Sequence, residues 1–262
     1  MVHALLADKA NRLFVVLAGC FIANALLAEM IGVKLFQLET AVGLGKADFT
    51  LLGQPHLSFV LSVGVLPWPL VFILTDVIND YYGVRGVRFL TLLTAVIIAF
   101  AFLVLYLPIA MPPDMGWWIG SGAAHGVPDM QAAFANIFGQ SMNIIIGSIA
   151  AFIIGQLADA FIFRRIKRLT GDKRIWLRAT GSTLISQLID SVVVTYLAFW
   201  ALRDMPFPLA TALVLTAYTY KLVVAILATP LIYLAHALIE RYLGKEKAHS
   251  MRENALRSAA EQ

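Results

Sequence analysis

Two ionisable residues within long apolar segments, Asp190 and Lys221, are the strongest candidates in this chain for a chemical role. A charged side chain at the centre of a transmembrane helix costs about 2.5–3.5 kcal/mol on insertion scales, and such residues mark transport pathways. Gln187 shares a helical face with Asp190, and Tyr218 lies one turn before Lys221. Their similar depths on consecutive antiparallel segments predict a salt bridge that offsets part of the desolvation. We therefore favour a binding role at mid-membrane over a purely structural one.

An earlier segment carries an amphipathic face with two aromatic residues and several polar ones. Trp68, Phe72, Asp76, Asn79 and Asp80 recur every three to four residues, so their side chains share one side of a helix. We expect Asp80 to be hydrated at the inner membrane interface. Asp76 lies one turn deeper and is a stronger candidate for a buried site.

Two further segments contribute candidates. Gln156 and Asp159 lie on one stripe, and Asp159 precedes a basic run at 164–168, so pairing with an arginine there is an equal alternative to a role in the site. Asn24 lies deep in the first apolar segment and is expected to face the same cavity.

The elements that position these residues are transmembrane helices. Hydrophobic residues form 60% of the 262-residue chain, and its mean hydropathy is +0.80. A bilayer core takes about 20 apolar residues per helix. We expect an all-α integral membrane protein, a single transport domain over 1–262 with a cytoplasmic tail at 242–262 that is helical or disordered. The six predicted helices are 12–35, 57–81, 87–110, 136–163, 176–201 and 209–241.

The distribution of positive charge predicts the orientation. The predicted outer connections hold only Lys34, Lys46 and Arg203 of the 20 lysines and arginines. The other end of the bundle holds Lys9, Arg12, Arg85, Arg88, Arg164, Arg165, Lys167, Arg168, Lys173, Arg174, Arg178, Arg241, Lys245, Lys247, Arg252 and Arg257. The positive-inside rule then places both termini in the cytoplasm. Topology thus accounts for the net charge of +4, and no nucleic-acid partner is predicted.

Other features favour a transporter over an enzyme. The sequence shows no phosphate-binding glycine loop, no metal-ligand spacing and no Ser/His/Asp set, so we predict neither cofactor nor catalysis. Cys20 is a lone thiol in an apolar run and forms no internal disulfide. Trp117 and Trp118, in the long outer connection at 111–135, are typical of anchors at the lipid headgroups, which we favour over a lid on the substrate site.

Several motifs resemble one known family. The stretch 69–83, which reads PLVFILTDVINDYYG, and the shorter stretches at 155–159, 182–190 and 220–221 resemble the signature of the queuosine-precursor transporters, which are also grouped as a vitamin-uptake family. Asp80 departs from that pattern, where glutamate is expected in many relatives. The resemblance implies import of 7-cyano-7-deazaguanine, 7-aminomethyl-7-deazaguanine or queuine across the bacterial inner membrane, for salvage into tRNA modification. The expected partners are this substrate and the lipid bilayer, and the sequence leaves a homodimer open.

The chemistry of a deazaguanine agrees with these residues. Its base edge presents two neighbouring donors, which one carboxylate accepts together, and an acceptor oxygen at position 6. Asp190 or Asp76 would accept, and Lys221, Gln187 or Gln156 would donate. Flat aromatic side chains would sandwich the ring; the candidates are Trp68, Phe72 and Tyr218.

Two rival functions remain open from the sequence. A substrate-binding subunit of an energy-coupling-factor vitamin importer also has about six helices, but needs partner ATPase and coupling subunits. An intramembrane enzyme would need facing carboxylates or a Ser–His pair in their own sequence contexts. Proton coupling and facilitated diffusion fit the sequence equally.

Overall fold

We describe the protein from a computed structural model, which describes residues 7–114, 122, 125–139, 142–170, 175–201 and 204–257. Trp117 and Trp118, predicted as headgroup anchors, lie outside the described residues. The described helices are α2 (Lys9–Ile31), α3 (Leu38–Ala41), η1 (Val63–Val65), α4 (Trp68–Ala110), α6 (Met130–Phe138), α7 (Met142–Thr170), α8 (Ile175–Thr195), the π-helical η3 (Tyr196–Ala201), α9 (Phe207–Leu243) and α10 (Lys245–Arg257).

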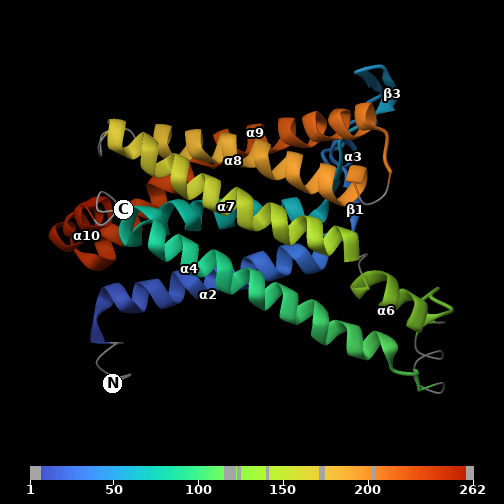
Figure 1. Ribbon diagram of the computed structural model, residues 1–262, viewed down its shortest axis with the longest axis horizontal. Coiled ribbons are helices and arrows are strands. Elements are labelled where there is room, and N and C mark those ends of the chain that lie inside the picture. The colour runs from blue at the N-terminus through green and yellow to red at the C-terminus, as the bar shows by residue number, and fades with distance from the viewer. Residues whose placement is uncertain are drawn as a thin grey trace.

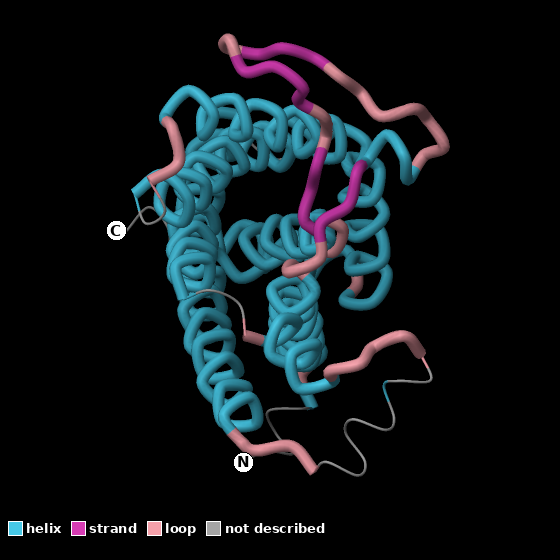
Figure 2. Tube along the Cα trace, turned by 90° about the vertical axis from the view of Figure 1, so that its right-hand side faces the viewer, coloured by secondary structure: helices cyan, strands magenta, loops and turns pink. Residues whose placement is uncertain are grey.

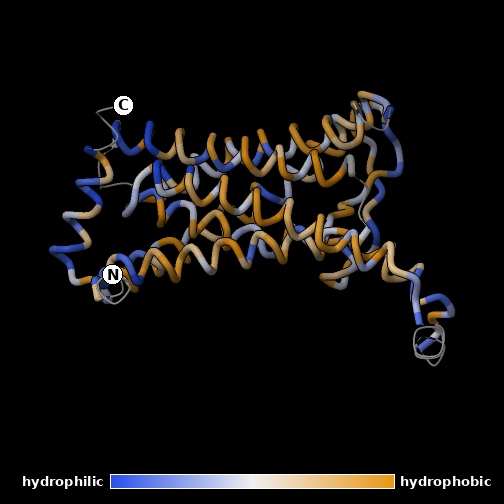
Figure 3. The backbone as a smooth tube through the Cα atoms, turned by 60° about the horizontal axis from the view of Figure 1, so that its bottom comes forward, coloured by the Kyte–Doolittle hydropathy of each residue, from blue (hydrophilic) through white to orange (hydrophobic). Residues whose placement is uncertain are grey.

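The prediction of an all-α membrane protein holds for the bulk of the chain. Five helices of the described part are long and apolar enough to cross a membrane. Figure 3 shows apolar residues along the middle of these helices and hydrophilic ones toward the ends, most clearly at the end that carries α10. The outward faces expose large apolar side chains, such as Val96, Leu103 and Leu227, as expected for contact with lipid.

The connection after α2 differs from the prediction. It contains two small antiparallel sheets, in which β1 (Leu35–Gln37) pairs with β4 (Val60–Ser62) and β2 (Phe49–Leu51) pairs with β3 (Gln54–Leu57). Figure 2 looks onto the end of the bundle that carries these strands. The helix predicted from residue 57 was therefore wrong over its first turns, because residues 54–57 and 60–62 pair as strands before the chain enters α4.

The segment α4 contains both helices predicted at 57–81 and 87–110. Gly83 interrupts it with φ 73° and ψ 177°, a backbone conformation that is essentially restricted to glycine. The two halves then run in opposite directions (Figure 1). They pack against each other, since a Cβ added at Gly86 would lie 3.5 Å from Cγ2 of Ile78.

The interior of the bundle has an apolar part and a polar part. Val71, Leu74, Ile78, Leu90 and Ile98 join the two halves of α4 in one apolar cluster. By contrast, the buried residues of α8 are mostly polar: Arg178, Ala179, Thr180, Ser182, Thr183, Ser186, Gln187, Ser191 and Thr195. A helix in lipid can bury a polar face only against protein or a water-filled cavity, so α8 lies at the functional centre of the bundle.

The predicted tail forms the helix α10, which packs onto the bundle instead of extending into solvent. Ala248 is fully buried there, and Met251 packs against the cluster of Val77 and Tyr81. Lys247 forms an ion pair with Asp8, the residue that caps α2. Both α10 and the start of α2 lie at the same end of the molecule (Figure 1).

Candidate functional site

A cavity of about 490 Å³, including the space at its mouth, lies between the first half of α4, α8 and α9. The lining residues are Val65, Trp68, Pro69, Phe72, Ile73, Asp76, Thr180, Thr183, Gln187, Tyr220, Lys221, Val224, Ala225, Ala228 and Ile232.

Helical periodicity explains why these residues meet. On α8, Thr180, Thr183 and Gln187 follow one another at spacings of three and four, and so form one face. The first half of α4 presents Trp68, Phe72 and Asp76 in the same way. Each helix therefore directs one stripe of polar and aromatic side chains into the shared space.

The strongest polar feature of the cavity is the carboxylate of Asp76. Only 1% of the residue is exposed, and neither carboxylate oxygen has a hydrogen-bond partner among the described residues. On the facing helix, Nε2 of buried Gln187 likewise has no partner in the described part. Leaving buried polar groups unmatched is costly, about 1–3 kcal/mol each in proteins and more for a charge. The site thus offers an acceptor pair and a donor to a bound molecule.

The predicted pair of Asp190 and Lys221 is confirmed. Nζ of Lys221 lies 2.5 Å from Oδ2 of Asp190, and the side chains are 15% and 23% exposed, respectively. Lys221 lines the cavity, whereas Asp190 stands behind it against α7. Gly155 of α7 makes room there, since a Cβ at that position would lie 3.4 Å from Cβ of Asp190.

Aromatic rings form the walls of the cavity. The ring centroids of Trp68 and Phe72 are 6.0 Å apart and their planes differ by 30°. The third aromatic lining residue is Tyr220, which lies on a different face of α9 from Tyr218. The hydroxyl of Tyr218 donates to the backbone oxygen of Leu184, 3.1 Å away, so this side chain joins α9 to α8.

Three other predicted site residues make contacts between helices and are not among the lining residues. Nδ2 of Asn24 donates to the backbone oxygen of Pro67 at 2.8 Å, which ties α2 to the entry of α4. The side-chain oxygen of Gln156 accepts from the hydroxyl of Thr75 at 2.6 Å.

Asp159 is the third of these residues. Its Oδ1 accepts from the hydroxyl of Ser186 at 3.0 Å, and the residue is fully buried. The pairing with a following arginine that the sequence left open gives way here to a hydrogen bond across to α8.

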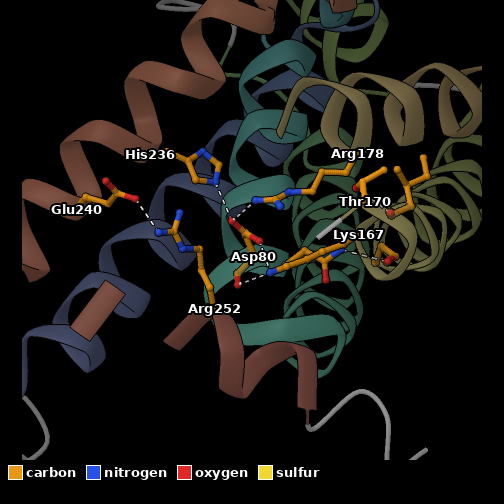
Figure 4. A network of polar contacts seen from close by, with 10 residues as sticks. Asp80, Lys167, Thr170, Arg178, His236, Glu240 and Arg252 are labelled. Carbon is orange, nitrogen blue, oxygen red and sulfur yellow. Dashed lines mark hydrogen bonds and ion pairs between the residues drawn. The ribbon is translucent and has the colours of Figure 1, made fainter. Parts of the chain in front are cut away.

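Asp80 corrects the sequence-based interpretation. It was expected to be hydrated, but it is fully buried and is the centre of an ion network (Figure 4). Its Oδ2 lies 2.8 Å from Nη2 of Arg178 and 3.0 Å from Nε2 of His236, and its Oδ1 pairs with Lys167. The three partners come from α7, α8 and α9, so spacing within one segment gave no sign of them.

Sequence reasoning also missed Thr180 and undervalued Tyr220. Thr180 continues the spacing of Thr183 and Gln187 by one turn, which was a usable signal. Its hydroxyl lies 2.8 Å from that of Thr229 on α9. Among the described residues, no group of three or more His, Cys, Asp or Glu side chains is placed to hold a metal ion.

Comparison with known proteins agrees with this geometry. The family described as "Putative vitamin uptake transporter" matches residues 62–235, a stretch that contains every lining residue of the cavity. A "Probable queuosine precursor transporter" of Bacillus subtilis (strain 168) is 31% identical over 179 residues, which are 68% of this chain and 72% of the relative.

Two further relatives are more distant. The "Queuosine precursor transporter" of Escherichia coli (strain K12) is 28% identical over 151 residues, 56% of this chain and 59% of the relative. A "Probable queuosine precursor transporter" of Haemophilus influenzae is 26% identical over 159 residues, 59% of each chain. No solved structure matches the chain. With a cavity that carries Asp76, Gln187 and Lys221 inside a multi-pass bundle, and a family match over most of its length, this chain belongs to the vitamin uptake transporter family.

Proposed function

We propose that this protein imports queuosine precursors across the bacterial inner membrane, as 7-cyano-7-deazaguanine, 7-aminomethyl-7-deazaguanine or queuine. The names of its relatives and the family match support transport of this class of solute. The observation that carries the assignment of the site is the buried carboxylate of Asp76, which has no partner in the described part of the chain and lies in a cavity with aromatic walls.

Of the two carboxylates predicted to bind the base edge, Asp76 is the better acceptor. Asp190 already pairs with Lys221, whereas both oxygens of Asp76 stay available to the neighbouring N1–H and 2-amino donors of a deazaguanine. Hydrogen bonds to a charged group contribute about 1.5–3 kcal/mol each. Gln187 or Lys221 then donates to the oxygen at position 6, and Trp68 and Phe72 hold the ring.

We further propose six membrane crossings with both termini in the cytoplasm. The apolar stretch Val63–Ala110 has 48 residues, which would be about 70 Å long as a straight helix and more than twice the thickness of a bilayer core. The reversal at Gly83 lets its two halves cross once each. The positive-inside rule supports the orientation, because the end that carries α10 is rich in lysine and arginine.

The test is uptake of labelled 7-cyano-7-deazaguanine into cells that cannot synthesise it, with and without this chain. We expect accumulation only with the chain, blocked by excess unlabelled deazaguanine and not by biotin. Accumulation that biotin blocks and deazaguanines do not would refute the assignment. Purified chain in proteoliposomes should also suffice, since a requirement for an ATPase partner would instead indicate a subunit of an energy-coupling-factor importer.

The role of Asp76 has a matched control. Asp76→Asn exchanges one acceptor oxygen for a donor, and we expect it to weaken binding of the base at least about 100-fold, as loss of two charge-assisted bonds predicts. Asp48→Asn changes an exposed carboxylate on the strand-bearing end and should leave binding unchanged. Equal affinity of the Asp76→Asn variant and the parent protein would show that another group reads the base edge.

A further inference from the structure

The ion network of Asp80 lies directly beyond the cavity on the helices that line it. Asp80 is four residues past Asp76, the last lining residue of α4, and His236 is four residues past Ile232, the last lining residue of α9. One turn of helix therefore separates the lining from the network on both elements. Both steps lead toward the end of the molecule that carries α10 (Figure 1).

The third lining helix shows the same register. On α8, which runs in the opposite direction, Arg178 comes two residues before Thr180, the first lining residue. Lys167 reaches the same carboxylate from α7. One aspartate thus joins four membrane elements in a single layer, and its partners have side chains no more than 5% exposed.

The ring of His236 completes this layer with two contacts. Nδ1 of His236 lies 2.9 Å from the backbone oxygen of Ile232, and Nε2 lies 3.0 Å from Oδ2 of Asp80. Both neighbours are hydrogen-bond acceptors. Asp80 holds the cationic side chains of Lys167 and Arg178 together beside the ring of His236, and without it the two cations would repel each other.

From this arrangement we infer that the Asp80 network is the gate that closes the cavity toward the α10 end. Well-packed apolar side chains would seal the same layer at no desolvation cost, so a buried charge network is a poor choice for stability alone. A network of discrete ion pairs has two distinct arrangements, formed and broken, which is what a reversible closure needs. The inference concerns access to the cavity and stands whichever solute occupies it.

The helix α10 covers the outer side of this gate. Arg252 pairs with Glu240 of α9 at 2.8 Å, and its guanidinium lies 5.7 Å from the ring centroid of Tyr81. The ring of Tyr81 in turn lies 5.7 Å from that of His236. Figure 4 shows Arg252 and Glu240 beside the Asp80 cluster. Movement of α10 would therefore be transmitted to the gate through Tyr81.

Cysteine accessibility tests this gate without a substrate. In a Cys20→Ser background, Thr183→Cys places one thiol in the cavity wall, and a membrane-impermeant maleimide is added to inside-out vesicles, which present the α10 end. Ser250→Cys, on the exposed surface of α10, reports the labelling rate at an open position and confirms the orientation. We expect Thr183→Cys to react far more slowly than Ser250→Cys.

Opening the gate should abolish this protection. His236→Ala removes one contact to Asp80, and we expect the Thr183→Cys labelling rate to rise about tenfold or more, the factor predicted for loss of one hydrogen bond to a charged group. An unchanged rate in folded protein, with Ser250→Cys labelling normally, would overturn the inference. Rapid labelling of the parent cavity from this side would overturn it as well.

Two substitutions of Lys167, one that removes its charge and one that keeps it, separate opening of the gate from misfolding of the protein. Lys167→Gln removes the cation that pairs with Asp80, whereas Lys167→Arg keeps it. The gate predicts fast cavity labelling with glutamine and slow labelling with arginine. Equal labelling of the two variants would show that the charge at this position does not control access.

Discussion

The pair of Asp190 and Lys221 allows a sharp separation of structure from function. Lys221→Met leaves the carboxylate of Asp190 without its cation, and Asp190→Asn leaves the ammonium without its anion. The contact is 2.5 Å long, and the side chains of Lys221 and Asp190 are 15% and 23% exposed, respectively. Removing one partner of a fully buried pair costs about 3–5 kcal/mol. With this partial exposure we expect each single variant to lose about 2–3 kcal/mol of unfolding free energy.

The double variant should recover most of the summed loss of the two single variants. With both charges removed, neither side chain is left buried and unpaired, so we expect a total cost of about 1–2 kcal/mol and a coupling energy of about 3 kcal/mol between the sites. Uptake should not recover, because Lys221 lines the cavity and its donor is missing.

The assay is reversible unfolding in mixed detergent micelles, followed by tryptophan fluorescence, with uptake measured on the same four proteins. Additive losses in the two single variants would refute a direct energetic link between Asp190 and Lys221. A double variant with parental uptake would show that the pair only sets the packing of α8 against α9.

Two further predictions concern the backbone and pH. In a thermal unfolding assay, Gly83→Ala should destabilise the fold by about 1–3 kcal/mol, because φ at this residue is +73° and its conformation suits only glycine. The control is Gly19→Ala, within α2 and with open space at its Cβ, which should be neutral or slightly stabilising in the same assay. The backbone N–H of Phe59 donates to Glu39 at 2.8 Å and lowers the pKa of that carboxyl below its usual 4.5. A lowered pKa adds stability above pH 4.5 that is lost as the pH falls through the folded value, so the parent should lose more stability than Glu39→Gln between pH 6 and pH 3, about the range over which carboxyls titrate. Equal losses in the two proteins would contradict the role of this bond.

Local pattern predicted correctly which residues lie on one helical face and which pair across two helices. Asp76, Trp68 and Phe72 share a face because their spacing matches the helical repeat, and they do line one cavity. The contact of Asp190 with Lys221 followed from their matching depth in the membrane on consecutive helices, because the bilayer thickness fixes how deep each residue of a spanning helix lies. Such inferences work where a single geometric rule relates residue number to position.

Predictions failed where contacts depend on the packing of distant segments. Tyr218 and Tyr220 differ by only two positions, but the rotation of α9 against α8 decided which of them faces the cavity. Residues 54–57 and 60–62 form short strands because they pair with strands earlier in the same connection, at 49–51 and 35–37, and hydropathy carries no information on such pairing.

By itself, then, the sequence determined that this chain enters a membrane, which segments are apolar enough to cross it and which charges those segments carry, because the cost of burying a charge in lipid depends on composition and length alone. Only the tertiary structure decided which charges meet. Asp80 finds Lys167, Arg178 and His236 at separations of 87, 98 and 156 residues, and only the packing of four helices brings these side chains to one carboxylate.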